Sequence, residues 1–381
     1  MSNIINKMFL FTRSKLGYAY YNMQYIRKTS KKLTAKDGTY AIVNVDDFFR
    51  HDDFGRYFYL ICMYFKHAGF NLSVKINWYD LKRKSRFNKL LLKQNYSFVR
   101  NCSAPLNTVV LVQPNKANRI IHLSYGYNIL QSGKFDCIVP YPMFPTQYKF
   151  YLSSAILEEV KRSDRTIKVF FAGSTGEEMY KNKKTEVYFN VIPRLKVLEI
   201  MSGFEKSRTL QTDSDKIFLT QLLSSKDYIN EVIISQVKTE EEEWLKILTR
   251  VDFFVCPPGV RMPWCHNCVE AMAAGAIPIL QYADLFYPPL LNLENCLTYT
   301  NSLELRLAIE KALEMKPFEI EKIRKNVLNY YNDYLSIDSI AKRIKKFSNN
   351  TNEELKVAIP FIPTYKQLES IFAFDRKNPV L

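Results

Sequence analysis

The segment from Val251 to Tyr282 limits the possible folds of this chain more than any other stretch. It opens with Asp252–Cys256, a short apolar run rich in aromatic and β-branched residues, which is typical of a strand buried on both faces. A proline pair and Gly259 end this strand, because proline donates no ladder hydrogen bond and glycine opens turns. The next regular element is therefore expected beyond this loop.

A helix over Cys268–Ala274 is predicted after the loop. His266 or Asn267 is a candidate N-cap, Gly275 ends the helix, and Ile277–Gln281 forms the next buried strand. In such a strand–loop–helix–strand unit, the loop and the helix N-terminus lie at the carboxyl end of a parallel sheet. Open α/β sheets bind ligands there, so the segment predicts an α/β fold with a ligand site in this loop.

The residue types in the loop suit a nucleotide diphosphate. A helix N-terminus offers unpaired N–H groups and a partial positive charge to a phosphate, and Arg261 and His266 would add donors. Asn267 and Glu270 are three residues apart and share a helix face, which would let Glu270 accept both hydroxyls of a ribose. Taken singly, Glu270 is better explained as a solvated helix residue and His266 as a cap. The whole string favours a donor site.

The string P-P-G…H-N-C-V-E-A-M-A-A-G-A-I-P-I-L resembles the nucleotide-sugar segment of GT-B glycosyltransferases, and exostosin-like members most. The resemblance implies two Rossmann-like domains with parallel sheets facing a cleft, a sugar nucleotide in the C-terminal one, and no catalytic metal or other cofactor. It implies that Glu270 holds the ribose and that Gly259 to Asn267 surround the diphosphate and donor sugar. The strong match covers about thirty residues, and the rest of the chain fits by the order of its elements.

One position departs from the pattern of that family. Many retaining members carry a second glutamate eight residues before the first, and Met262 stands there in this chain. We therefore expect transfer with inversion.

The length of 381 residues and the apolar fraction of 47% predict a globular protein of two domains. We expect a basic acceptor-binding domain over residues 1–150, a nucleotide-sugar-binding domain over 151–345 and a helical tail over 346–381. Further strands are predicted at Tyr40–Val45, Leu72–Ile76, Val109–Gln113, Ile120–Leu123, Cys137–Pro140, Ile167–Ala172, Val232–Ser235 and Cys296–Tyr299. Helices are predicted at Tyr57–Ala68, Arg194–Met201, Glu240–Leu248 and Leu303–Glu314. This alternation is typical of parallel α/β architecture.

Neither a membrane span nor a signal peptide is expected. The longest uncharged apolar stretch, Tyr57–Phe65, is far shorter than the roughly 20 residues that a bilayer requires. The chain has seven cysteines, and Cys265 and Cys268 lack further partners for a zinc site. The cysteines are therefore predicted to be free thiols of a cytoplasmic protein. A peripheral position on the inner face of the membrane is a further expectation.

The net charge of +16 lies entirely in residues 1–150, which hold 23 of the 54 Lys and Arg residues and 7 of the 38 Asp and Glu residues. A basic acceptor-binding domain predicts an anionic or lipid-linked glycan as acceptor, or contact with an anionic membrane. Arg27–Lys32 and Lys82–Arg86 are the candidate contacts, and compositional drift is the alternative. Such a transferase would serve the synthesis of a surface polysaccharide or glycoconjugate.

The loop Asp46–Arg56 offers candidates for the base that an inverting transfer requires. His51, Asp52 and Asp53 lie together there, and Asp46 or Asp47 could orient a histidine. The alternative is that Asp52 or Asp53 caps the following helix.

A second loop, Ala172–Glu178, follows a predicted strand and places Gly173 and Ser174 where a leaving diphosphate would lie. Arg194, Lys196 and Arg208 are further candidates for stabilising that diphosphate, although each singly is more commonly a surface residue.

Three other classes stay open. A metal-dependent transferase would use Asp46 and Asp47 to hold a divalent ion. A protein that binds nucleic acid or another polyanion without catalysis would explain the basic half, but the chain shows no zinc-finger spacing, basic zipper or RNA-binding signature, so no nucleic acid is expected. A non-catalytic partner with the same fold is the third.

Overall fold

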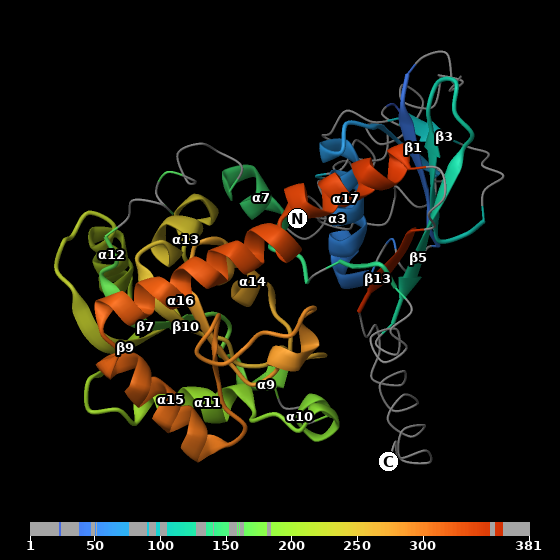
Figure 1. Ribbon diagram of the computed structural model, residues 1–381. Coiled ribbons are helices and arrows are strands. Elements are labelled where there is room, and N and C mark those ends of the chain that lie inside the picture. The colour runs from blue at the N-terminus through green and yellow to red at the C-terminus, as the bar shows by residue number, and fades with distance from the viewer. Residues whose placement is uncertain are drawn as a thin grey trace, which may run out of the picture. The chain divides into compact units, whose positions relative to one another are not determined.

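The computed structural model describes residues 38–46, 52–75, 97–99, 105–126, 135–139, 141–151, 164–180, 184–350 and 355–360, with a few single positions besides. These residues form two compact units, each with its own sheet (Figure 1). The described chain passes from the first unit to the second between Cys137 and Ile138 and returns between Ser339 and Ile340. Gly126, which already belongs to the second unit, is the exception. The predicted boundary near residue 150 therefore lies beyond this first passage.

The first unit contains a seven-stranded sheet of order β3-β2-β1-β4-β5-β13-β6. Its strands are β1 Tyr40–Asn44, β2 Asn71–Lys75, β3 Ser97–Val99, β4 Thr108–Val112, β5 Arg119–Tyr125, β6 Cys137–Ile138 and β13 Leu355–Ile359. The sheet is mixed rather than parallel throughout, because β4 runs antiparallel to both β1 and β5. A tight turn at Asn115, with a φ of 60°, joins β4 to β5, and so short a connection permits only antiparallel pairing.

One helix, α3 Arg56–His67, follows the short 3₁₀ turn η2 Asp52–Gly55 and packs against β2. Gly55 is its N-cap, with a φ of 82° that a glycine adopts without strain. Aromatic and aliphatic side chains along α3, among them Phe58 and Phe65, form the core of this unit.

The second unit contains a six-stranded sheet in which every strand pair is parallel. Its strands are β7 Ile167–Ala172, β8 Ser207–Leu210, β9 Ile229–Ser235, β10 Val251–Val255, β11 Ile277–Leu280 and β12 Leu297–Thr298. Their order is β12-β11-β10-β7-β9-β8, so the chain builds one side of the sheet from β7 and then the other from β10. β7, β10 and β11 are buried along their whole length, which confirms the predicted α/β class.

Helices cover both faces of this sheet. They are α7 Pro145–Tyr151, α9 Glu177–Tyr180, α10 Lys184–Phe189, α11 Arg194–Ser202, α12 Asp213–Leu222, α13 Glu241–Leu248, α14 His266–Ala273, α15 Ser302–Glu314 and α16 Pro317–Tyr330, with the 3₁₀ turn η3 Ala283–Leu285. In Figure 1, α11 and α15 lie on one side of the strands, and α13, α14 and α16 lie on the other.

The amino end of this sheet is held by buried charges. Asp252, at the start of β10, pairs with Arg324 of α16 and accepts a hydrogen bond from the Tyr228 hydroxyl at 2.5 Å. Arg165, just before β7, donates to the carbonyl groups of Leu248 at 3.1 Å and of Ala274 at 2.9 Å. These contacts join the strand starts to two helix ends at the edge of the sheet opposite the candidate site.

The C-terminal part of the chain differs from the predicted helical tail over 346–381. After a π-helical turn, η4 Tyr331–Leu335, helix α17 Ile337–Asn349 leaves the second unit, and β13 then joins the first sheet parallel to β5. The run Leu355–Ile359 is apolar apart from one lysine, and it pairs with β5 on one side and with β6 on the other. Residues 361–381 lie outside the described part of the chain.

None of the helices in the described ranges has the length and apolarity needed to cross a membrane. The six cysteines in those ranges carry no disulfide, and five of them are buried.

Candidate functional site

The candidate site lies at the carboxyl ends of β7 and β10. These two strands pair directly, and they are the strands at which the order of the sheet changes direction. The loops that leave them therefore emerge side by side, with the start of α14 at the end of the second loop. Parallel α/β sheets bind their ligands in this place.

Asn267 joins the two loops. Its side-chain amide donates to the carbonyl oxygen of Ala172 at the end of β7, over 2.7 Å. A Cβ built on Gly173 would lie 3.2 Å from that amide nitrogen and 3.4 Å from the Arg194 guanidinium. A residue with a side chain would push these groups apart, so Gly173 is required for the close approach.

Arg194, at the start of α11, braces the same loops from inside. It is 6% exposed and donates to the carbonyl oxygens of Pro257, Pro258 and Ser174 over 3.1 to 3.3 Å. Its guanidinium also lies over the Tyr180 ring, 4.7 Å from the centroid. Its positive charge thus lies beneath the site, where it fixes the loops.

The other two predicted cations lie away from these loops. Lys196 pairs with Glu199 on the exposed face of α11 at 2.8 Å. Arg208 lies on the edge strand β8 and pairs with Glu231 at 3.7 Å.

Gly259 allows the loop after β10 to fold back on itself. Its N–H donates to the carbonyl oxygen of Pro263 at 3.0 Å, and a Cβ on it would lie 2.7 Å from the carbonyl oxygen of Met262. Met262 is buried under the turn, whereas Arg261 is exposed at its tip. The Thr185 hydroxyl of α10 donates to Val260 at 2.7 Å and anchors the loop from outside.

The N-terminus of α14 lacks a side-chain cap. Its N-cap is Cys265, and the predicted caps His266 and Asn267 are instead the first two helical residues. That prediction was wrong: the helix begins at His266, and the Asn267 side chain instead donates to Ala172 of β7. None of the described side chains caps the first-turn N–H groups of α14, and an uncapped helix N-terminus is the arrangement that binds anions.

Cys265 and Cys268 flank this turn with the C-x-x-C spacing. Burial raises the pKa of the Cys265 thiol, with Arg194 acting in the opposite direction. The thiol is therefore protonated at neutral pH and is a poor nucleophile.

Glu270 lies one turn into α14 and is fully buried. Its carboxylate accepts from the Phe144 backbone N–H at 2.7 Å and from the Trp244 indole N–H at 2.6 Å, and both of its oxygens lie 3.1 Å from Nδ1 of His266. Burial by itself would raise the pKa of Glu270, but His266 and the two N–H donors hold it below its ordinary value. A contact between this carboxylate and a ribose stays a prediction, and it requires that one of these donors be displaced.

His266 lies at the surface end of the same cluster. Its side chain is 36% exposed, and its ring lies 6.1 Å from that of Phe144 between centroids. Trp244 and Phe144 were not predicted, since they belong to α13 and to the segment before α7, and no sequence motif relates them to α14.

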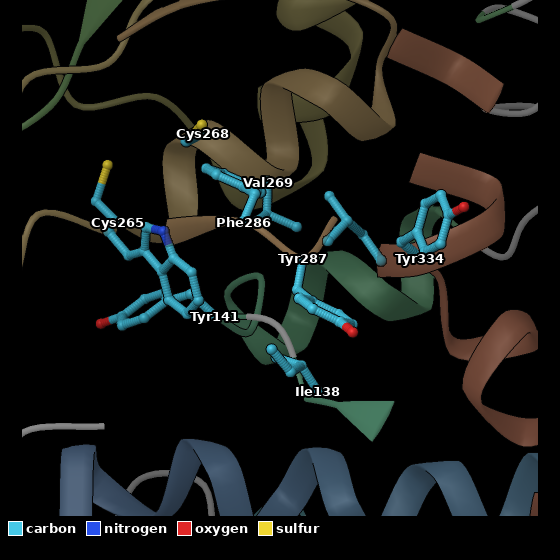
Figure 2. A pocket seen from close by; sticks show the side chains of 10 residues that line it. Ile138, Tyr141, Cys265, Cys268, Val269, Phe286, Tyr287 and Tyr334 are labelled. Atoms are coloured by element: carbon cyan, nitrogen blue, oxygen red, sulfur yellow. The ribbon is translucent and has the colours of Figure 1, made fainter. Parts of the chain in front are cut away.

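A small cavity lies beside the start of α14 (Figure 2). Its volume is about 20 Å³, room for about one water molecule. Aromatic side chains dominate its lining, among them Tyr141, Phe286, Tyr287, Tyr334 and Trp264. Among the described residues, the buried indole N–H of Trp264 has no hydrogen-bond acceptor.

The first unit has a polar cluster at the carboxyl end of β1. The carboxylate of Asp46 accepts from the Tyr125 hydroxyl and from the Asn107 amide, the latter at 3.1 Å, and the Asp46 N–H donates back to Asn107 at 3.1 Å. Asn107 precedes β4 and Tyr125 ends β5, so three strands contribute to one cluster. Only Asp46 was predicted, because Asn107 and Tyr125 form no local motif with it.

The predicted catalytic loop is partly described. His51 and Asp47 lie outside the described residues, and Asp52 begins η2. Asp53 pairs with the buried Arg56 at 3.1 Å. The N-cap of α3 is Gly55, which has no side chain, and capping by Asp52 or Asp53 stays a prediction.

Within the part of the chain that the structure describes, no three residues among His, Cys, Asp and Glu come together as a metal site. A two-carboxylate site at Asp46 and Asp47 stays a prediction.

No known protein family and no curated protein sequence matches this chain. Among solved structures, Anabaena HepE in complex with UDP and glucose is similar, with a TM-score of 0.42, 10% identity, and coverage of 81% of this chain and 99% of that one. A glycosyltransferase from Rickettsia africae is similar with a TM-score of 0.35 and 10% identity, over 77% of this chain and 80% of that one. The N-terminal domain of trehalose-6-phosphate phosphatase from Candida albicans is similar with a TM-score of 0.30 and 12% identity, over 76% of this chain and 68% of that one. These TM-scores lie below 0.5, and we base the function on the residues of the site.

Proposed function

We propose that this protein is a glycosyltransferase of the GT-B type, which moves a sugar from a nucleotide-sugar donor to an acceptor glycan. One observation carries the proposal: the uncapped N-terminus of α14 lies where the strand order of a fully parallel sheet changes direction. The two loops beside it are held in place by close contacts at Gly173 and Gly259. The donor diphosphate would bind to the first turn of α14 and against Gly173 and Ser174.

This arrangement suits the departure of a nucleoside diphosphate. When the bond between the sugar and the phosphate oxygen breaks, the electron pair passes to that oxygen and its negative charge grows. The helix N-terminus and its N–H groups stabilise that charge, and the cationic Arg194 lies beneath the same loops. We do not assign Glu270 to the ribose, because protein donors enclose its carboxylate.

The acceptor part of the proposal rests on sequence and on the first unit. The surplus of positive charge in residues 1–150 supports an anionic or lipid-linked glycan, as in the synthesis of a surface polysaccharide or glycoconjugate, and contact with an anionic membrane. Met262 in place of a second glutamate supports inversion. The base would come from the loop after β1, where His51, Asp52 and Asp53 remain the candidates and Asp46, at the carboxyl end of the strand, could orient a histidine.

Thermal unfolding with a panel of nucleoside diphosphates and their sugar conjugates, with and without a chelator, tests the donor site. A ligand at a hundred times its dissociation constant adds about 2.7 kcal/mol of stability, which raises the melting temperature measurably. We expect a shift with one base that persists in chelator. No shift with any nucleotide would contradict the proposal.

A matched pair of variants locates the site. Asn267→Asp should weaken binding of that nucleotide about tenfold or more, because the new carboxylate repels the diphosphate and cannot donate to Ala172. Asn326→Asp is the control, since Asn326 of α16 also donates to a backbone carbonyl, that of Glu294 at 2.9 Å, but through a solvent-exposed hydrogen bond. Equal affinity in both variants would place the nucleotide elsewhere.

A further inference from the structure

Glu270 and His266 form a pair whose geometry is set by groups outside their own helix. Phe144 donates to one oxygen of the Glu270 carboxylate and Trp244 to the other, so the group cannot rotate without losing a hydrogen bond. His266 lies one turn earlier on α14, and its Nδ1 is 3.1 Å from each oxygen. A fully buried charge needs such partners to persist.

This contact selects one form of the His266 ring. Burial works against ionisation of Glu270, but His266, Phe144 and Trp244 together lower its pKa, so the carboxylate is ionised at neutral pH. An ionised carboxylate only accepts hydrogen bonds, and Nδ1 must therefore carry a proton. Nε2 is left for another partner: it accepts when the ring is neutral and donates when the ring is an imidazolium.

The ring also lies where an anion would bind. His266 is the first helical residue of α14, its side chain is 36% exposed, and no side chain caps the helix. An anion at the helix N-terminus would meet the first-turn N–H groups and this ring together.

We propose that Glu270 is a positioning residue, and that it orients His266 so that the imidazolium Nε2–H donates to a phosphate oxygen of a diphosphate bound at the start of α14. The ligand in this inference rests on the proposed function, whereas the Glu270–His266 pair does not. The inference differs from the role that the GT-B resemblance implies for Glu270. Ribose hydroxyls would reach its carboxylate only by displacing Phe144, Trp244 or His266 itself.

The pair is tested in the protein without ligand. The chain has four histidines, so long-range ¹H–¹⁵N NMR spectra can resolve each ring, and His266→Gln assigns the one of interest. In the wild-type protein we expect the neutral His266 ring to be protonated at Nδ1 and not at Nε2. A neutral ring protonated at Nε2 would overturn the pair, and this readout does not require a Glu270 variant to fold.

The phosphate contact is tested by calorimetry with three probes: the nucleoside diphosphate that stabilises the protein, its 2′,3′-dideoxy counterpart, and inorganic pyrophosphate. Glu270→Gln and His266→Gln should each weaken all three about tenfold, since the lost hydrogen bond is to phosphate. His122→Gln, at an exposed position on β5, is the control and should leave all three unchanged.

The outcomes separate the two proposals. A loss in Glu270→Gln that is confined to the ribose-bearing nucleotide would assign Glu270 to the ribose and overturn the positioning role. If neither pyrophosphate nor any nucleoside diphosphate of the panel bound to the wild-type protein, the proposed function and the phosphate contact would both fail. The NMR measurement would still decide whether Glu270 orients His266.

Discussion

Gly259 approaches the carbonyl oxygen of Met262 so closely that a Cβ on it would lie 2.7 Å from that oxygen. Gly259→Ala should therefore open the loop after β10, lower stability by about 1 to 3 kcal/mol and weaken nucleotide binding. Gly176→Ala is the control, because the nearest atom to its new Cβ would be 3.9 Å away. Urea unfolding and nucleotide titration measure both effects. Wild-type behaviour of both variants would mean that the loop is not held by this contact.

Arg194→Lys should destabilise the protein by about 2 kcal/mol and weaken nucleotide binding. A single ammonium cannot reproduce the planar fork that reaches Pro257, Pro258 and Ser174. Arg208→Lys, at the exposed edge strand β8, should leave both the urea midpoint and the affinity unchanged. Equal effects of the two substitutions would contradict the bracing role.

Stability should fall with acid in a way that depends on Glu270. Its pKa is lower in the folded protein than its ordinary value of 4.5, so its stabilising contribution is complete above about pH 4.5 and is lost as pH falls through the folded-state pKa. The stability difference between wild type and Glu270→Gln should therefore shrink between pH 5 and pH 3. Urea midpoints over this range measure it, and a constant difference would contradict the assigned ionisation.

Arg324→Met should destabilise the protein strongly, by about 3 kcal/mol, because Asp252 would keep a buried charge without its ionic partner. Lys216→Met, which removes the exposed pair with Glu240, should produce no measurable change. Comparison of the two urea midpoints tests whether the amino end of the second sheet depends on its buried pair.

The strands nearest the candidate site could be predicted closely from the sequence. Ile167–Ala172 was predicted with the bounds that the structure shows, and β10 and β11 shift by one residue at most, because an apolar run with glycine or proline close to one end marks a buried strand well. β8, Ser207–Leu210, was missed because only Leu210 is buried on this edge strand, and so it has no apolar pattern.

The contacts of the candidate site were harder to predict. Asn267 and its partner Ala172 are 95 residues apart, and Glu270 and Phe144 are 126 apart. Each hydrogen bond depends on how the loops and helices pack in three dimensions, and no local spacing encodes it. The sequence pattern therefore located the loop and the helix, but it named Asn267 as a cap and left Trp244 and Phe144 out.

β13 lies inside the first sheet, between β5 and β6, although it comes more than two hundred residues after β5 in the chain. During synthesis, the six strands of the second sheet, which end at Thr298, are complete before Leu355–Ile359 is made. The first sheet is therefore the first to be started during synthesis and the last to receive all of its strands. Until then, the edge of β5 that β13 will occupy remains open to pairing with another chain, so the early half of this protein is the part most exposed to misassembly while it is being made.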